Sequence, residues 1–147
     1  MTKGLVTVFG GSGFIGRYAA RELVKKGWRV RVACRHVNIA GDVRLAGPPG
    51  WVDVVQANIR NRESIERALD GADAIVNLVG IMFEKGAQTF ESSQRDGAAL
   101  LADVAAGLGI TRFVHVSAIG ADAESGADYA RTKAEGEAAV RAAIPSA

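Results

Sequence analysis

The stretch VFGGSGFIGR, residues 8–17, places four glycines in ten positions directly after the apolar run at residues 5–9. Gly10, Gly13 and Gly16 form the pattern G-x-x-G-x-x-G between an expected strand and an expected helix. In that context the first glycine permits a tight turn, the second lets the backbone approach a pyrophosphate, and the third lets the helix pack closely on the sheet. The stretch therefore predicts a dinucleotide-binding turn. A glycine-rich turn that holds no ligand is the alternative.

The helix that follows the turn is expected at residues 14–26, where apolar residues recur at roughly helical spacing: Phe14, Ile15, Tyr18, Ala19, Leu23 and Val24. Its first backbone N–H groups have no partner within the helix, and they offer partial positive charge to phosphate groups. The residues that stand between the glycines lie at this N-terminal end of the helix. We therefore add Ser12, Phe14 and Ile15 to the expected cofactor contacts.

Strand-like and helix-like segments alternate along the whole chain. Strands are expected at residues 5–9, 28–34, 51–56, 74–79 and 110–117, helices at 14–26, 62–69, 91–108 and 128–143, and a loop rich in glycine and proline at 38–50. Such alternation predicts parallel strands joined by right-handed crossovers. The expected fold class is α/β, a Rossmann-type doubly wound parallel sheet of about five strands in one domain over residues 1–147. Ligands of such sheets bind at the carboxyl ends of the strands, where the glycine turn lies.

Composition excludes several classes of protein. The chain has 147 residues, of which 48% are hydrophobic, and 18 Lys and Arg against 16 Asp and Glu leave a net charge of +2, so a polybasic nucleic-acid binder is not expected. A single cysteine and two histidines predict neither an internal disulfide nor a metal site, and they favour a reducing cytoplasm. The apolar run at residues 5–9 is too short for a signal peptide or a membrane span, so we expect no direct membrane insertion.

The end of the second expected strand, VACRH at residues 32–36, bears on the choice of cofactor. NAD-binding domains place an acid on the ribose 2′-hydroxyl about 20 residues beyond the glycines, and an arginine there accommodates the 2′-phosphate of NADP. Arg35 occupies this region, which favours NADP(H) and leaves NAD(H) as the second choice. Arg17 is a second candidate for the phosphate. Alternatively, Arg17, Arg21 and Lys25 are a solvated stripe on one helix face.

Two further segments, ANIRN at residues 57–61 and NLVG at residues 77–80, follow expected strands at the same edge of the sheet. An amide could bond the edge of adenine, and small apolar residues could pack against adenine and ribose. The cofactor contacts expected here are Asn58, Ile59, Leu78, Val79 and Gly80. Alternatively, Asn58 and Asn61 only cap the following helix.

The segment YARTK, residues 129–133, places Tyr129 and Lys133 four positions apart on one helix face. An ammonium group close to a phenol stabilises the phenolate, which lets a tyrosine exchange a proton near neutrality. Ser117, after the fifth expected strand, could hold a substrate oxygen against it. These three residues are the expected catalytic site of a carbonyl reduction. An ordinary amphipathic surface is the alternative.

The motifs GGSGFIG, NLVG, VSAIGAD and YARTKAEGE resemble the short-chain dehydrogenase/reductase superfamily, in its extended and atypical branches, over nearly the whole chain. The last two, with NLVGI, are most similar to the NAD(P)H-binding accessory subunits of respiratory complex I and their bacterial relatives, often labelled NAD-dependent epimerase/dehydratase. The resemblance implies a bound NADPH. It assigns the glycines of the turn to the pyrophosphate, Arg35 to the 2′-phosphate, Lys133 to the nicotinamide ribose, and Tyr129 with Ser117 to the catalytic positions.

Two departures from the family pattern bear on function. Gln94 occupies the position where catalytic relatives have an asparagine, and the sequence stops at RAAIPSA, where the family begins another strand and a small substrate-binding domain. We therefore expect the C-terminal substrate domain to be missing, and cofactor binding rather than turnover. The alternative is an NADP-dependent oxidoreductase or sugar-nucleotide epimerase/dehydratase. Expected partners are respiratory complex I subunits, which would hold the chain at the periphery of the inner membrane, or a second copy of the chain.

Overall fold

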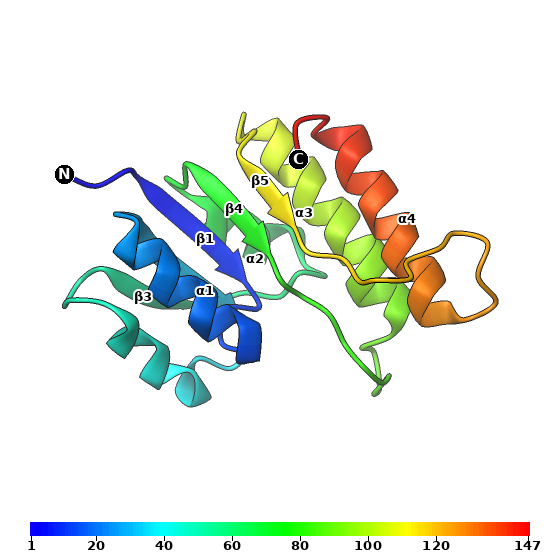
Figure 1. Cartoon of the computed structure of the whole chain (residues 1–147), viewed down its shortest axis with the longest axis horizontal. Helices are drawn as coiled ribbons and strands as arrows, with labels where there is room; N and C mark the ends of the chain where they lie inside the picture. The colour runs from blue at the N-terminus through cyan, green and yellow to red at the C-terminus, as the bar shows by residue number, and fades with distance from the viewer.

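A five-stranded parallel sheet forms the centre of the computed structural model, which describes residues 1–147 (Figure 1). Its strands are β1 (Leu5–Phe9), β2 (Arg29–Cys34), β3 (Val52–Gln56), β4 (Ala74–Asn77) and β5 (Phe113–His115). The strand order is β3-β2-β1-β4-β5, and every neighbouring pair is parallel. The expected Rossmann-type fold class is confirmed. The chain passes from β1 to β2 on one side of β1 and later places β4 on its other side. The topological switch point, where the strand order reverses, therefore lies at the carboxyl end of β1.

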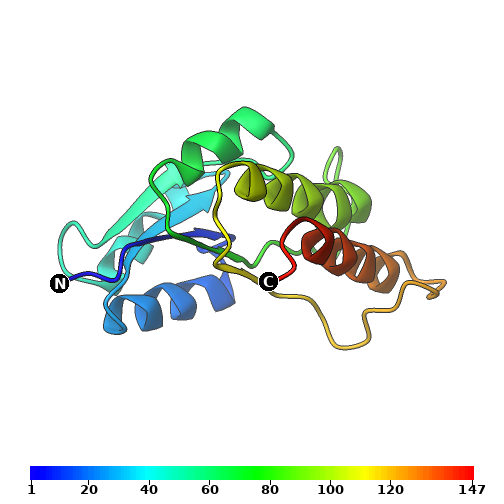
Figure 2. The same cartoon turned by 90° about the horizontal axis from the view of Figure 1, so that it is seen from above.

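Helices cover both faces of the sheet (Figure 2). They are α1 (Phe14–Lys25) on one face, α2 (Arg62–Leu69) and α3 (Asp96–Gly107) on the other, and α4 (Asp128–Ala143) beside α3. Each face has its own apolar cluster, of 11 buried residues under α1 and 17 buried residues under the other helices. None of the helices is long and apolar enough to cross a membrane.

Strand β1 shows why the sequence forms a fully covered strand. Its side chains alternate between the two clusters, with Val6 and Val8 packing on the side of α1 and Phe9 on the side of α2 and α3. Thr7, also on the latter side, is buried, and its hydroxyl donates a hydrogen bond to the Ala68 carbonyl oxygen at 2.9 Å. A continuous apolar run therefore suits this central position.

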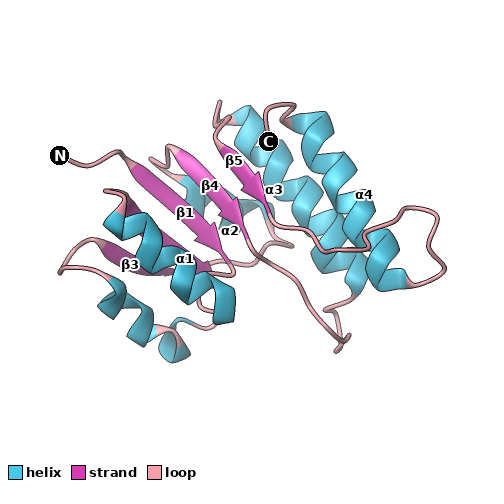
Figure 3. Cartoon of the chain, viewed as in Figure 1, coloured by secondary structure: helices cyan, strands magenta, loops and turns pink.

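Several element boundaries differ from the sequence expectations (Figure 3). Two short 3₁₀ helices, η1 (Val37–Ile39) and η2 (Gly41–Ala46), overlap the loop expected at residues 38–50, and Val43 of η2 is buried in the cluster under α1. Strands β4 and β5 are shorter than expected, since their pairing ends at Asn77 and His115. The helix expected at 91–108 begins as a π-helical turn, η3 (Glu91–Arg95), before α3.

The apolar face expected for α1 is partly wrong. Phe14, Ile15 and Tyr18 are exposed, whereas Gly16 and Ala20 are the buried residues of the helix. The reason is the close approach of the start of α1 to the glycine turn, which leaves no room for a larger side chain at Gly16. Farther along the helix, Leu23 and Val24 do pack against the cluster under α1. The exposed side chains lie toward the carboxyl edge of the sheet or toward solvent, and the rings of Phe14 and Tyr18 pack edge to face with centroids 5.6 Å apart.

Candidate functional site

A cavity of about 590 Å³ opens at the carboxyl edge of the sheet, a size typical of small-molecule sites. Every expected cofactor contact except Lys133 lines it: Gly10, Ser12, Gly13, Phe14, Ile15, Gly16, Arg35, Asn58, Ile59, Leu78, Val79 and Gly80. The structure thus brings four separate segments of sequence to one cavity.

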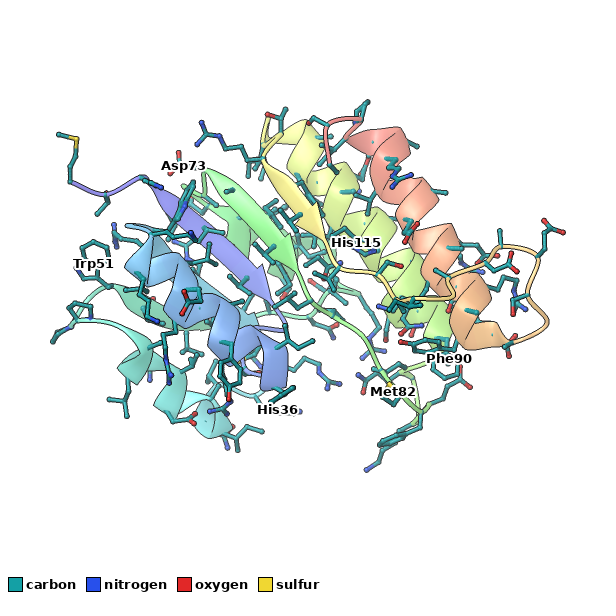
Figure 4. All side chains as sticks on the ribbon, viewed as in Figure 1. His36, Trp51, Asp73, Met82, Phe90 and His115 are labelled. Atoms are coloured by element: carbon teal, nitrogen blue, oxygen red, sulfur yellow. The ribbon has the colours of Figure 1, made fainter.

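Other residues also line the cavity and were not expected from the sequence, among them Arg60, Ile81, Met82, Gln88, Ser93 and Val116. Ile81 and Met82 directly follow the NLVG segment, so extending that motif would have found them. Gln88 and Ser93 carry no local signal, because only the path of the chain after β4 brings them to the cavity. Figure 4 shows Met82 on this segment and His36 across from it, on the segment that leaves β2.

The glycines of the turn serve different steric needs. Gly10 has a φ of +77°, and a Cβ there would lie 3.0 Å from the carbonyl carbon of Leu78. A Cβ on Gly16 would lie 2.4 Å from the carbonyl oxygen of Gly10, which only a backbone shift would relieve. A Cβ on Gly13 would approach only that oxygen, at 3.4 Å, with no other atom within 4 Å. Gly16 is therefore required for packing, whereas Gly13 keeps open the space beside the cavity.

The N-terminus of α1 lies at this cavity without a side-chain cap. Gly13 is the N-cap residue, and the first turn holds no acidic side chain. The N–H groups of Phe14 and Ile15, which line the cavity, have no acceptor four residues earlier within the helix. These donors and the helix dipole favour an anion here.

Two arginines were expected as ligands of the 2′-phosphate, Arg35 after β2 and Arg17 in α1, and their surroundings differ. Arg35 is exposed, lines the cavity and makes no ion pair. Arg17 lies outside the lining; its Nε donates to the Ser12 carbonyl oxygen at 2.9 Å, and its guanidinium forms an ion pair with Asp42. Of these two arginines, Arg35 is therefore the one available to a ligand. Beside it, burial raises the pKa of the Cys34 thiol, and no group of three or more His, Cys, Asp or Glu is arranged to hold a metal.

The two asparagines after β3 have separate roles. Asn61 caps α2, because its Oδ1 accepts a hydrogen bond from the Ser64 N–H at 2.8 Å. Asn58 lines the cavity, and its Oδ1 accepts from the Arg60 N–H at 3.0 Å. The amide nitrogen of Asn58 makes no hydrogen bond within the chain, so it remains available to a ligand. The helix-capping alternative thus holds for Asn61.

Lys133 lies behind the wall of the cavity. Its side chain is only 5% exposed, and its Nζ is 3.1 Å from where a Cβ on Gly80 would stand. Burial lowers the pKa of the Lys133 ammonium, and Glu137, one turn along α4, opposes this effect. Because Gly80 lines the cavity, the ammonium lies next to a residue that a ligand would touch.

The other two expected catalytic residues do not line the cavity. Tyr129 is half-buried in the first turn of α4, and its ring packs edge to face against Phe90 with centroids 5.8 Å apart. Ser117 follows β5, and its Oγ is buried without a hydrogen-bond partner. The residues that line the cavity therefore form a binding site, and the side chains of Tyr129 and Ser117 lie outside that lining.

Comparisons with known proteins bear on the family of the chain. A family model described as NAD(P)H-binding matches residues 10–144. The mitochondrial NADH-ubiquinone oxidoreductase 40 kDa subunit of Neurospora crassa is 33% identical over 95% of this chain and 37% of its own length. The ceramide reductase of Caulobacter vibrioides is 34% identical over 99% of this chain and 44% of its own length. The chain thus spans less than half the length of these curated relatives.

A similar solved structure comes from Bacillus halodurans, from a protein assigned to the NAD-dependent epimerase/dehydratases. The TM-score is 0.81 with 26% sequence identity, over 94% of this chain and 64% of that one. The similarity in fold therefore extends over nearly the whole of this chain.

Proposed function

Because the chain belongs to the NAD(P)H-binding family, we propose that its cavity binds NADPH in preference to NADH. One observation carries this proposal: the glycine turn, the uncapped N-terminus of α1 and the unpaired Arg35 meet in a single cavity. Phosphate groups are the ligand chemistry that matches all three features.

The glycine turn would hold the pyrophosphate. Gly10, Gly13 and Gly16 let the backbone approach closely, and the free N–H groups of Phe14 and Ile15 supply donors. Neither Asp nor Glu lines the cavity, so no carboxylate would repel the phosphates there.

Arg35 would read the 2′-phosphate. A guanidinium bonds a phosphate with two parallel N–H donors, and Arg35 has no carboxylate partner to leave first. Arg17 does not serve this role in the proposal, since Asp42 already neutralises it. The position at the end of β2 that an acid would need for the ribose hydroxyls of NADH holds a cysteine and this arginine.

The remaining contacts follow from the position of each segment along the cavity. Asn58 and Ile59 would hold the adenine, and Leu78, Val79 and Gly80 would border the ribose. Lys133 would donate from behind Gly80 to the nicotinamide ribose. When bound, the nicotinamide ring can supply a hydride; this chain's own contribution is to bind and orient it.

We assign the chain cofactor binding without efficient turnover. Tyr129 packs against Phe90 and stays outside the cavity lining. The family resemblance also implies that Gln94 stands where catalytic relatives have an asparagine. The 33% identical relative supports a proposed role in an assembly like NADH-ubiquinone oxidoreductase. Co-purification of the full protein with respiratory subunits would test that role and the expected peripheral membrane location, and ultracentrifugation would test self-association.

A reductase is the second candidate. Ser117 presents a buried Oγ with no partner, Lys133 lies against Gly80, and a 34% identical relative is a ceramide reductase. In this case Tyr129 would act as the acid toward a carbonyl oxygen. Tyr129→Phe in the full-length protein would abolish carbonyl reduction, and unchanged activity with every carbonyl tested would exclude it.

The first experiment is an equilibrium titration of the 147-residue chain with NADPH and, separately, with NADH, followed by nicotinamide fluorescence and calorimetry. Tight binding with a preference for NADPH supports the proposal. Equal affinity for both nucleotides removes the role of Arg35. If neither binds to a chain that circular dichroism shows to be folded, the proposal fails for this domain alone.

A further inference from the structure

Two buried amide side chains hold the segment that leaves β4. Asn77 is 1% exposed; its Oδ1 accepts from the Val79 N–H at 3.1 Å, and its Nδ2 lies 3.2 Å from His115 Nδ1. Gln94 is 2% exposed, and its Oε1 accepts from the Ile81 N–H at 3.3 Å. The two amides therefore fix the backbone on both sides of Gly80.

The second amide also connects this segment to α4. Gln94 Nε2 donates to Thr132 Oγ1 at 3.1 Å, and the Thr132 hydroxyl in turn donates to the Asp128 carbonyl oxygen at 2.7 Å. Thr132 directly precedes Lys133, whose Nζ lies against Gly80. A continuous set of hydrogen bonds thus joins the cavity wall to the helical turn that carries the ammonium.

Packing leaves this connection little freedom. A Cβ on Gly136 would stand 2.2 Å from the main-chain oxygen of Gln94, so α4 and η3 are in direct backbone contact there. Both ends of the Gln94 side chain are bonded in a buried site, where an unsatisfied amide would be costly. The side chain is therefore held in one orientation.

We propose that Gln94 is a positioning residue that, through Thr132, fixes the Lys133 ammonium against Gly80 at the nicotinamide end of the cavity. This inference rests on the proposed function for the identity of the ligand. It gives the glutamine a role other than that of an asparagine in a proton relay, because its amide nitrogen donates to Thr132 and its amide oxygen accepts from Ile81.

Thr132 offers a matched pair of variants. Thr132→Val keeps the volume and removes the acceptor, whereas Thr132→Ser keeps the hydroxyl; Gln94→Met is an independent way to break the same connection. The first measurement uses the chain without nucleotide: the pH dependence of Lys133 modification by an amine-selective reagent, followed by mass spectrometry. The groups around Lys133 that also titrate are Glu137 on α4 and His115 on β5.

We expect the modification midpoint of Lys133 to move up toward that of a free lysine in Thr132→Val and Gln94→Met, because the released ammonium becomes hydrated. Thr132→Ser should keep the wild-type midpoint. A lower melting temperature with an unmoved midpoint in both disruptive variants would overturn the inference.

The second measurement compares NADPH with adenosine 2′,5′-bisphosphate, which lacks the nicotinamide half. Thr132→Val should lower the affinity for NADPH by at least roughly tenfold, the scale of one charged hydrogen bond. Its affinity for the bisphosphate should stay within about twofold of that of the wild type. Equal losses for both ligands would indicate a merely structural role and overturn the inference. If the wild-type chain binds neither ligand, the proposed function fails, and the lysine profile still decides whether Gln94 positions Lys133.

Discussion

Gly13 and Gly16 lie three positions apart, and the structure predicts that substitution by alanine affects binding at the first and folding at the second. Gly16→Ala would place a methyl group 2.4 Å from the Gly10 carbonyl oxygen and 2.5 Å from the Cα of Gly11. Gly13→Ala would place it 3.4 Å from that oxygen, in ordinary contact, beside the cavity. The first change should therefore damage the fold, and the second should damage the binding of the pyrophosphate.

The magnitudes follow from the contacts. Overpacking against rigid backbone costs about 3 kcal/mol at the upper end of its usual range, and the better helix propensity of alanine returns up to about 1 kcal/mol. Gly16→Ala should thus lower the free energy of unfolding by about 2 kcal/mol, which for a chain of this size corresponds to a fall in melting temperature of roughly 6 °C. Gly13→Ala should cost less than about 1 kcal/mol, the loss expected when alanine replaces glycine as N-cap.

Thermal unfolding followed by circular dichroism measures the first quantity, and a fluorescence titration with NADPH measures the second. We expect Gly13→Ala to melt near wild type and to lose most of its NADPH affinity, because the added methyl group stands between the helix N-terminus and the phosphates. The reasoning is refuted if Gly13→Ala binds NADPH as wild type does, or if Gly16→Ala melts at the wild-type temperature.

Three further predictions concern the charged and polar groups around the cavity. Arg35→Ala should weaken the binding of NADPH by about 1.5–3 kcal/mol and leave the binding of NADH nearly unchanged. Arg17 is already paired with Asp42, so Arg17→Ala should leave the binding of both nucleotides unchanged in the same calorimetric titration. An Arg17→Ala variant that loses NADPH selectivity would reverse this assignment. Burial, with Lys133 nearby, lowers the pKa of His115 below 6.5, so the unfolded chain takes up this proton first as the pH falls. Stability should be unaffected by His115 above about pH 6.5 and decline below it until the lowered pKa is reached. Urea unfolding between pH 7.5 and 5 should show a smaller decline in His115→Asn, and parallel profiles would contradict the prediction. Gly80→Ala should change stability by less than about 0.5 kcal/mol, because only the mobile tip of Lys133 lies 3.1 Å from the new methyl group. The same variant should bind NADPH more weakly by roughly 1 kcal/mol, because the new methyl group displaces the Lys133 ammonium from its proposed contact with the nicotinamide ribose. A titration that shows wild-type affinity would exclude that contact.

Local pattern predicted most of the fold. The apolar run of β1, the glycine turn and the alternation of strands with helices depend on neighbours in sequence, and the structure has all five strands in the expected order of appearance. The expected α1 face was partly wrong because apolar periodicity does not reveal which residues must be small where a helix crosses a turn. Gly16 and Ala20 are buried, and Phe14 is 80% exposed.

The sequence by itself determined the strand–turn–helix unit, the arginine after β2 and the absence of an acid there, because each is a property of a short segment. Only the tertiary structure decided which distant segments share the cavity and which charged groups are already paired. The sequence makes both Arg35 and Arg17 candidates for the phosphate, and only the structure shows that η2 brings Asp42 to Arg17 alone. Likewise, the bond between Gln94 and Thr132 spans 38 positions, and such contacts depend on how α4 packs against η3, which no local periodicity encodes.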